Sequence, residues 1–163
     1  MKFKEIVFDL FKVNSQLVKK EEQLYCLAHC ISADFAMAGG IVVEFNKRWN
    51  MRQRLISKYS HAFPQFQYTN GFAIAEIVNQ PTDKVFPVYN MVTKKNVYDQ
   101  PTPETIRNAL VFMREDMIKQ GLNRVAMPRI GCGIDGQNWE EIRNIIKEVF
   151  RYTDIEVLIC SLK

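Results

Sequence analysis

Stretches with the composition of β-strands alternate with amphipathic helices along this chain. Such alternation is typical of an α/β domain with a mixed, mostly parallel sheet between two layers of helices. The run VFPVYNMVT is apolar on both faces, as expected of a strand covered by helices on both sides, and Pro87 limits hydrogen bonding along one of its edges. The expected strands are Phe3–Phe8, Tyr25–His29, Ala73–Val78, Val85–Thr93, Arg124–Met127 and Ile155–Cys160.

Three helices are expected between these strands. One begins at Thr102, a capping residue with a proline at the first helical position, and its apolar face continues until Gly121 ends the helix. Another begins at Asn138, with Glu141 as the acidic third residue and a broad apolar face beyond it. The third is expected through Ile41–Tyr59, where apolar residues keep helical spacing.

Length and composition exclude several classes of protein. The 163 residues, 47% of them hydrophobic, are enough for one domain with a substantial core, expected to comprise residues 1–163. No apolar run approaches the roughly 18 to 20 residues that span a membrane, and the charges within Met1–Phe11 are unlike a signal peptide. The cysteines form no C-x-x-C pair and no cluster with histidines, so neither a zinc site nor a disulfide framework is indicated. These cysteines are Cys26, Cys30, Cys132 and Cys160. We therefore expect a cytoplasmic protein with reduced thiols and no membrane association.

The charge balance of the chain is mildly basic. Lysine and arginine outnumber aspartate and glutamate by 22 to 18, which gives a net charge of +4. This excess lies in no long run and favours anionic ligands only weakly, so a solvated surface explains it better than a face that binds nucleic acid. Modified DNA or RNA is permitted as a partner but is not required. The chain is expected to act as a monomer.

Two glycine-rich loops follow expected strands. The first, SADFAMAGGI, enters a helix at Gly39 and Gly40, and the free N–H groups at a helix N-terminus favour phosphate. A tight turn between strand and helix accounts for this glycine pair equally well. The second loop, PRIGCGIDG at Pro128–Gly136, has successive N–H groups that could wrap a pyrophosphate.

The second loop also matches the dinucleotide-binding pattern G-x-G-x-x-G, at Gly131, Gly133 and Gly136. That pattern normally opens the first strand-to-helix turn of a unit that continues with another strand and an acidic residue. Here one helix and one strand follow, and the helix begins after the third glycine. A nicotinamide-type site is therefore not favoured.

A third loop, TKKNVYDQPTPE, carries Lys94 and Lys95 at its start. A lysine pair beyond a strand is usually a solvated edge. A functional role needs a carboxylate nearby, and Asp135 in the second glycine loop could supply one at the same edge of the sheet. A deprotonated lysine amine can attack an aldehyde or hemiacetal carbon, with an aspartate as general acid and base.

Several segments together resemble a macrodomain, and within that fold the terminal ADP-ribose protein glycohydrolase branch. These segments are LAHCIS, MAGGI, TKK ahead of a P-T-x-E helix start, and MPRIGCGID followed by W-E-E. The similarity covers most of the chain, from about Ile6 to Leu162. It implies a three-layer α/β/α fold, with ADP-ribose or an ADP-ribosylated macromolecule as ligand.

The resemblance assigns the adenine end of the ligand to the residues after the first strand. Asp9 would bind the adenine amino group beside Leu10, and Leu162 would close this end of the site. Phe8 stands where the family usually has glycine, which puts the local backbone shape in question. The segment Lys12–Leu24 looks longer than its family counterpart and is expected to be a surface excursion.

The same resemblance places the rest of the ligand over the glycine loops. His29 and Ser32 would lie near the distal ribose, although a histidine satisfied by its neighbours at a strand end is the alternative for His29. Cys132 fits better as a small residue in a phosphate-binding loop than as a nucleophile. The ligand-binding residues expected in the loops are Gly39, Gly40, Ile41, Pro128, Ile130, Gly131, Cys132, Gly133 and Ile134.

The family chemistry assigns the nucleophile to the first lysine of T-K-K, Lys94, and the acid/base role to the aspartate of G-C-G-I-D, Asp135. Lys95 is excluded only by the match to T-K-K. The resemblance implies removal of mono-ADP-ribose from acidic protein side chains or from nucleic acid, with no metal or cofactor. A phosphatase acting on ADP-ribose-1″-phosphate and a non-catalytic ADP-ribose reader are the alternatives.

Overall fold

A mixed sheet forms the centre of the protein. In this computed structural model, which describes residues 1–59, 70–79 and 84–162, the sheet has six strands in the order β1-β6-β5-β2-β4-β3. All neighbouring strands are parallel except the pair β3 and β4. The strands are β1 (Lys2–Val7), β2 (Cys26–Ser32), β3 (Phe72–Asn79), β4 (Val85–Lys94), β5 (Arg124–Met127) and β6 (Glu156–Ser161).

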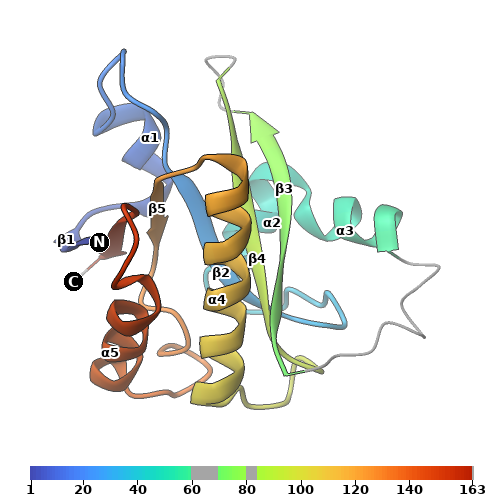
Figure 1. The fold of residues 1–163 in the computed structure, drawn as a ribbon. Coiled ribbons are helices and arrows are strands. Elements are labelled where there is room, and N and C mark those ends of the chain that lie inside the picture. Colours follow the sequence, from blue (N-terminus) through green and yellow to red (C-terminus); the bar gives the residue numbers. More distant parts are fainter. Residues whose placement is uncertain (60–69, 80–83, 163) are drawn as a thin grey trace.

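Helices cover both faces of this sheet, which gives the expected three-layer α/β/α arrangement (Figure 1). The helices are η1 (Leu10–Lys12), α1 (Val13–Gln16), α2 (Val42–Trp49), α3 (Met51–Tyr59), α4 (Pro103–Gln120) and α5 (Trp139–Phe150). The helices α4 and α5 pack on one face, and η1, α1, α2 and α3 pack on the other. The two termini lie near each other, beside β1 (Figure 1).

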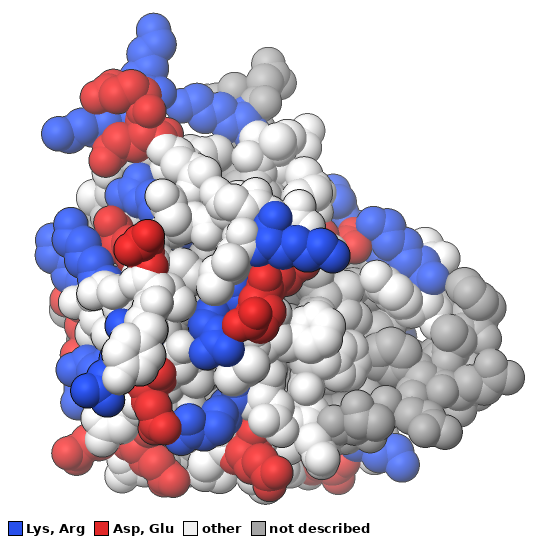
Figure 2. All heavy atoms as spheres, viewed as in Figure 1, with Lys and Arg blue, Asp and Glu red and all other residues white. Residues whose placement is uncertain are grey.

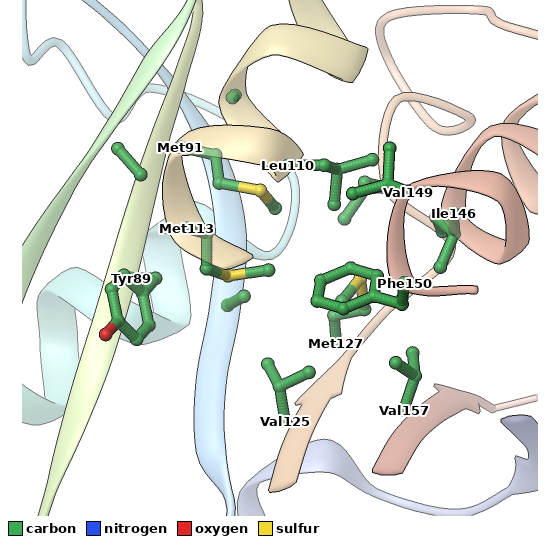
Figure 3. Close-up of a cluster of buried hydrophobic side chains, with 14 of the residues drawn as sticks. Tyr89, Met91, Leu110, Met113, Val125, Met127, Ile146, Val149, Phe150 and Val157 are labelled. Carbon is green, nitrogen blue, oxygen red and sulfur yellow. The ribbon is translucent and has the colours of Figure 1, made fainter. Parts of the chain in front are cut away.

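Alternating side chains of the strands feed the two cores. In β2, Cys26 and Ala28 belong to the core beneath α4 and α5, whereas Leu27 and Ile31 belong to the core on the opposite face. Figure 3 shows the first of these cores, in which side chains of β4, β5 and β6 meet those of α4 and α5. Because both faces are covered, β4 is buried from its second to its ninth residue, as its apolar sequence predicts.

The caps that the sequence predicts for α4 and α5 are confirmed. The Thr102 hydroxyl accepts from the N–H of Thr105, and Gly121 ends α4 in the left-handed conformation with φ of 70°. The side chain of Asn138 accepts from the N–H of Glu141 at the start of α5. These caps fix where each helix begins relative to the loop before it.

Two elements differ from the sequence-based expectation. The helix expected through Ile41–Tyr59 is two helices, because Asn50 takes a left-handed conformation with φ of 51° between α2 and α3. The segment after Lys12 is not only a surface excursion: Asn14 is buried, and its side chain exchanges two hydrogen bonds with the backbone of Tyr25. The short helix α1 therefore anchors this segment to the start of β2.

Charged side chains of both signs are mixed over the face that carries α4 and α5 (Figure 2). No broad area of one sign covers the described part of this face, in keeping with the small net charge of +4. None of the helices within the described residues has the length and apolar character needed to span a lipid bilayer.

Candidate active site

The loops that follow β2, β4 and β5 meet at one edge of the sheet. These three strands are parallel neighbours, so their carboxyl ends lie together, as the sequence predicts for an α/β sheet. The loops enclose a cavity of about 250 Å³. Its wall also includes the first residues of α2.

Lys94 and Asp135 form an ion pair at this cavity. Lys94 is the last residue of β4 and Asp135 lies in the loop after β5, and the Lys94 Nζ is 2.7 Å from the Asp135 Oδ1. Both side chains are largely shielded from solvent, with 10% and 15% of their surface exposed. Lys95, by contrast, is exposed and does not line the cavity. The structure therefore brings together the lysine and the aspartate that the sequence singled out.

A β-bulge in the pairing of β2 with β4 lies directly beside Lys94. The pairing of β2 with β4 shifts register between Ile31 and Ser32, so that Ser32 lies opposite Lys94. The next residue, Ala33, donates its N–H to the Lys94 carbonyl at 2.9 Å. Bulges commonly re-aim a side chain beside an active site, and this one lies at the position where the lysine leaves the sheet.

Backbone N–H groups without a protein acceptor line the same cavity. No side chain caps the N-terminus of α2, so the N–H groups around Ile41 and Val42 have no hydrogen-bond acceptor among the described residues. The N–H groups of Gly131, Gly133 and Ile134 likewise have none within the described part of the chain. A helix N-terminus and a glycine loop of this kind can both bind an anion.

The two glycine loops touch across the cavity. If residue 39 carried a Cβ, that atom would lie 2.8 Å from the Cδ1 of Ile134. Gly131 has a φ of 73°, and a Cβ there would lie 2.9 Å from the Cδ1 of Ile106. Gly131 is therefore favoured both by its backbone conformation and by its neighbour, whereas a side chain at residue 39 would have to displace the end of the Ile134 side chain.

Most of the expected site residues line the cavity. They are Ser32, Gly39, Gly40, Ile41, Lys94, Pro128, Ile130, Gly131, Gly133, Ile134 and Asp135. Further residues that line the cavity were not predicted from the sequence, because no motif marks their side chains as part of a binding site. These are Cys30, Ile31, Met37, Ala38, Val42, Val97 and Arg129.

His29 does not reach the cavity. The strand expected to end at His29 continues to Ser32, so His29 lies inside β2 and is fully buried. Its ring stacks on Phe45 with centroids 3.8 Å apart, and its Nε2 is 2.6 Å from the Asn90 Oδ1. Burial lowers the pKa of His29 to about 4, against the smaller opposing effect of the hydrogen bond with Asn90. His29 is therefore a neutral histidine of the core, which is the alternative to the predicted position near the distal ribose.

Cys132 lies in the loop after β5 but does not line the cavity. Its thiol donates to the Ile130 carbonyl at 3.2 Å, and burial raises its pKa above the ordinary value. Cys30 does line the cavity, and burial and then the Asp135 carboxylate raise its pKa to about 12. Neither thiol is activated as a nucleophile.

The residues expected at the adenine end lie at the same edge of the sheet but beyond the cavity wall. Asp9 follows β1 and accepts a hydrogen bond from the Phe11 N–H at 3.0 Å. The Leu10 side chain is buried in the core shared with α2 and α3. Leu162, directly after β6, is 78% exposed. Their part in ligand binding remains a prediction.

The arrangement can bind an anionic group and carry out covalent chemistry beside it. The glycine loops offer N–H donors, Lys94 offers an amine, and Asp135 can take up or return a proton. Among the described residues there is no group of three histidine, cysteine or acidic side chains placed to hold a metal ion.

Comparison with known proteins found a matching family model, related proteins and similar solved structures. The model of the Macro domain family matches residues 29–146. The protein named ADP-ribose glycohydrolase OARD1 from Bos taurus is 36% identical over 136 residues, which cover 83% of this chain and 81% of that protein. Its namesake from Homo sapiens is 35% identical with the same coverage. The macrodomain of Mycobacterium tuberculosis DarG superposes with a TM-score of 0.77 over 98% of this chain and 97% of that one, at 19% identity.

Proposed function

Because this chain belongs to the Macro domain family and is homologous to proteins named ADP-ribose glycohydrolase, we propose that it hydrolyses the bond between ADP-ribose and a modified macromolecule. The substrates proposed are mono-ADP-ribosylated proteins, linked through acidic side chains, or ADP-ribosylated nucleic acid. The single observation that carries the proposal is the ion pair of Lys94 with Asp135 at the wall of the cavity.

The cavity has the donors that a diphosphate needs. The amides at the N-terminus of α2 and those of Gly131, Gly133 and Ile134 have no acceptor among the described residues, and phosphate oxygens would supply acceptors. With the diphosphate on these amides, the distal ribose would lie toward Lys94 and Asp135, and the adenine toward Asp9 and Leu162.

The ion pair supports a lysine-dependent hydrolysis. Asp135 takes a proton from Lys94, and the free amine bonds to C1″ of the distal ribose while the bond from C1″ to the acceptor breaks. The acceptor leaves with the proton held by Asp135. The ribose ring of the adduct opens to a protonated imine, and one water then hydrolyses this imine to release ADP-ribose and restore the Lys94 ammonium.

The direct test is release of free ADP-ribose from mono-ADP-ribosylated protein and from ADP-ribosylated DNA. Wild type, Lys94→Ala and Lys95→Ala are compared, because Lys95 is the same residue type one position away and faces solvent. We expect release by wild type and Lys95→Ala and none by Lys94→Ala, which should still bind ADP-ribose. The faster substrate identifies the acceptor class.

Other outcomes would identify other functions. Phosphate released from ADP-ribose-1″-phosphate, without release from either macromolecule, would indicate a phosphatase. Thermal stabilisation by ADP-ribose without turnover of any substrate would indicate a reader module. Unchanged turnover in Lys94→Ala would contradict the lysine mechanism. The cytoplasmic location and the monomeric state remain predictions.

A further inference from the structure

The carboxylate of Asp34 joins the loop after β2 to the loop after β4. Its Oδ1 accepts from the Ser32 hydroxyl and, at 3.1 Å, from the Ala36 N–H, both in its own loop. Its Oδ2 accepts from the Val97 N–H at 2.9 Å, in the loop that begins at Lys94. One side chain thus bridges the loop after β2 and the loop after β4, both of which line the cavity.

These contacts hold the backbone at Lys94 and directly after it. The Lys94 carbonyl accepts from the N–H of Ala33, the residue before Asp34. Val97, three residues further along the chain, donates its N–H to the Asp34 carboxylate. The chain is therefore anchored to the Asp34 loop at two points where it leaves the sheet after Lys94.

Asp34 itself does not line the cavity, so a ligand there would not touch it. Burial raises its pKa, but the hydrogen bonds from Ser32, Val97 and Ala36 outweigh burial and keep the pKa below its ordinary value. The group is an anion at neutral pH and accepts from every donor that faces it. Its contacts are with the backbone and hydroxyl of the loops rather than with the ion pair.

We propose that Asp34 is a positioning residue that fixes Lys94 at the distance and angle needed to attack C1″ of the distal ribose. This inference rests on the proposed hydrolase function and assigns a role that the catalytic pair does not include. A nucleophile must be held within a fraction of an ångström of its productive position, and the two anchors limit the movement of the Lys94 backbone.

The principal test is Asp34→Asn compared with Asp99→Asn. Asparagine has one acceptor oxygen, so in either orientation of its amide the Ala36 N–H or the Val97 N–H loses its acceptor. Asp99 is the matched control, because among the described residues its carboxylate accepts only from the Asn96 N–H (2.9 Å), in its own turn, and joins no other described loop. Both variants carry the same change in charge.

The readouts are kcat for ADP-ribose release, the Kd for free ADP-ribose and the melting temperature. In Asp34→Asn we expect kcat to fall by between about tenfold and a hundredfold, while Kd and melting temperature stay close to those of Asp99→Asn. If Asp34 had a purely structural role, Asp34→Asn would lower the melting temperature, and kcat would not fall while Kd stayed unchanged.

A second pair of variants, of which only one removes the bridge, leaves Asp34 unchanged. Val97 is the second residue of the turn Asn96–Asp99, a position that proline accepts, and proline has no N–H to donate to Asp34. Val97→Pro should lower kcat below that of Val97→Ala, which keeps the N–H. This comparison decides the question if Asp34→Asn does not fold.

The failures of the two proposals are distinguishable. Wild type that releases no ADP-ribose from any substrate contradicts the hydrolase function. Active wild type together with equal kcat values in Asp34→Asn and Asp99→Asn overturns the positioning role alone. A loss of ADP-ribose affinity in Asp34→Asn as large as its loss of kcat also overturns that role, since the residue would then act on binding.

Discussion

Lys94 and Lys95 are adjacent and chemically alike, yet only one of them faces the cavity. Lys94 is the last residue of β4 and pairs with Ser32 directly after the register shift between β2 and β4, whereas Lys95 is already in the exposed loop. Residue type and spacing could not separate these two lysines, because the bulge depends on how β2 pairs with β4. The family pattern T-K-K selected Lys94, and the geometry independently places it beside Asp135.

Gly133 tests the assignment of the loop after β5 to the phosphates. A Cβ at this residue meets no atom within 4 Å, and its φ is not in the left-handed region. Gly133→Ala should therefore keep its melting temperature but weaken ADP-ribose binding, because the methyl group would keep a phosphate from the loop amides. Binding measured by calorimetry should fall by about tenfold if one good hydrogen bond to the anion is lost.

Gly136→Ala is the matched control in the same loop. It also meets no atom within 4 Å, but its φ of 68° makes alanine strained there. Strain should cost about 1 kcal/mol of stability with little change in ADP-ribose affinity. The assignment would be contradicted if Gly133→Ala bound ADP-ribose as tightly as wild type.

His29 should make the stability of the protein depend on pH. Its pKa is about 4 in the folded state and about 6.5 when exposed, so the unfolded chain binds a proton over an interval in which the folded chain does not. The free energy of unfolding is therefore undiminished by His29 above pH 6.5 and decreases as the pH falls toward 4. By the acid end of this interval the decrease is on the order of 3 kcal/mol.

Urea unfolding between pH 7.5 and 4 measures how the free energy of unfolding depends on pH. The other histidine, His61, is replaced by glutamine in every sample so that His29 alone is compared. The additional variant His29→Gln should show a shallower decline in the free energy of unfolding below pH 6.5. Equal slopes with and without His29 would contradict its burial as a neutral group.

Elements with strong local signals could be predicted, and those set by tertiary contacts could not. The helix α4 begins and ends at capping residues that the sequence displays directly, and α5 begins at one. The break at Asn50 has no such signal, because asparagine occurs both inside helices and in the left-handed conformation. The extension of β2 to Ser32 depends on its pairing with β4, which no local pattern encodes.

The ion pair between Lys58 of α3 and Glu76 of β3 joins one helix to the edge of the sheet. The Lys58 Nζ lies 2.8 Å from the Glu76 Oε1, and the Glu76 side chain is only 2% exposed. Lys58→Met should cost about 2 kcal/mol, because a buried carboxylate would be left without a counter-ion. Arg107→Met, in the exposed pair with Glu148, should cost less than about 0.5 kcal/mol.

Chemical denaturation of the two methionine variants measures both values. Equal and small losses would show that water replaces Lys58 at Glu76 and that the pair does not hold α3 against β3. A larger loss in Lys58→Met, restored by the further change Glu76→Leu, would identify the buried charge as the cause.

At the scale of the whole molecule, the parallel topology is what assembles the site. Lys94 and Asp135 are far apart in the sequence, and they meet because β4, β2 and β5 are consecutive parallel strands with their carboxyl ends at one edge. The order of strands cannot be read from the alternation of strand and helix alone. The role of Asp34 was missed for the same reason, since its partner Val97 belongs to another loop.

The raised pKa values of the thiols predict slow alkylation of the folded protein. Burial raises the pKa of Cys26, Cys30 and Cys160 to about 12, and it also raises that of Cys132. Iodoacetamide at pH 8 should label the folded chain far more slowly than the chain in urea, because thiolate is the reactive form. Labelling of Cys132 at the rate of a free thiol would contradict its assignment as a packing residue of the loop.

Trapping the covalent adduct on the folded wild-type protein tests the role of Lys94 most directly. The protein is incubated with mono-ADP-ribosylated substrate and cyanoborohydride, which reduces an imine to a stable secondary amine, and the modified residue is located by peptide mass spectrometry. Lys94 is the expected site, with no adduct in Lys94→Ala and the usual adduct in Lys95→Ala. Substrate turnover with no trapped adduct, or with the adduct on another lysine, would contradict the role given to Lys94 and Asp135.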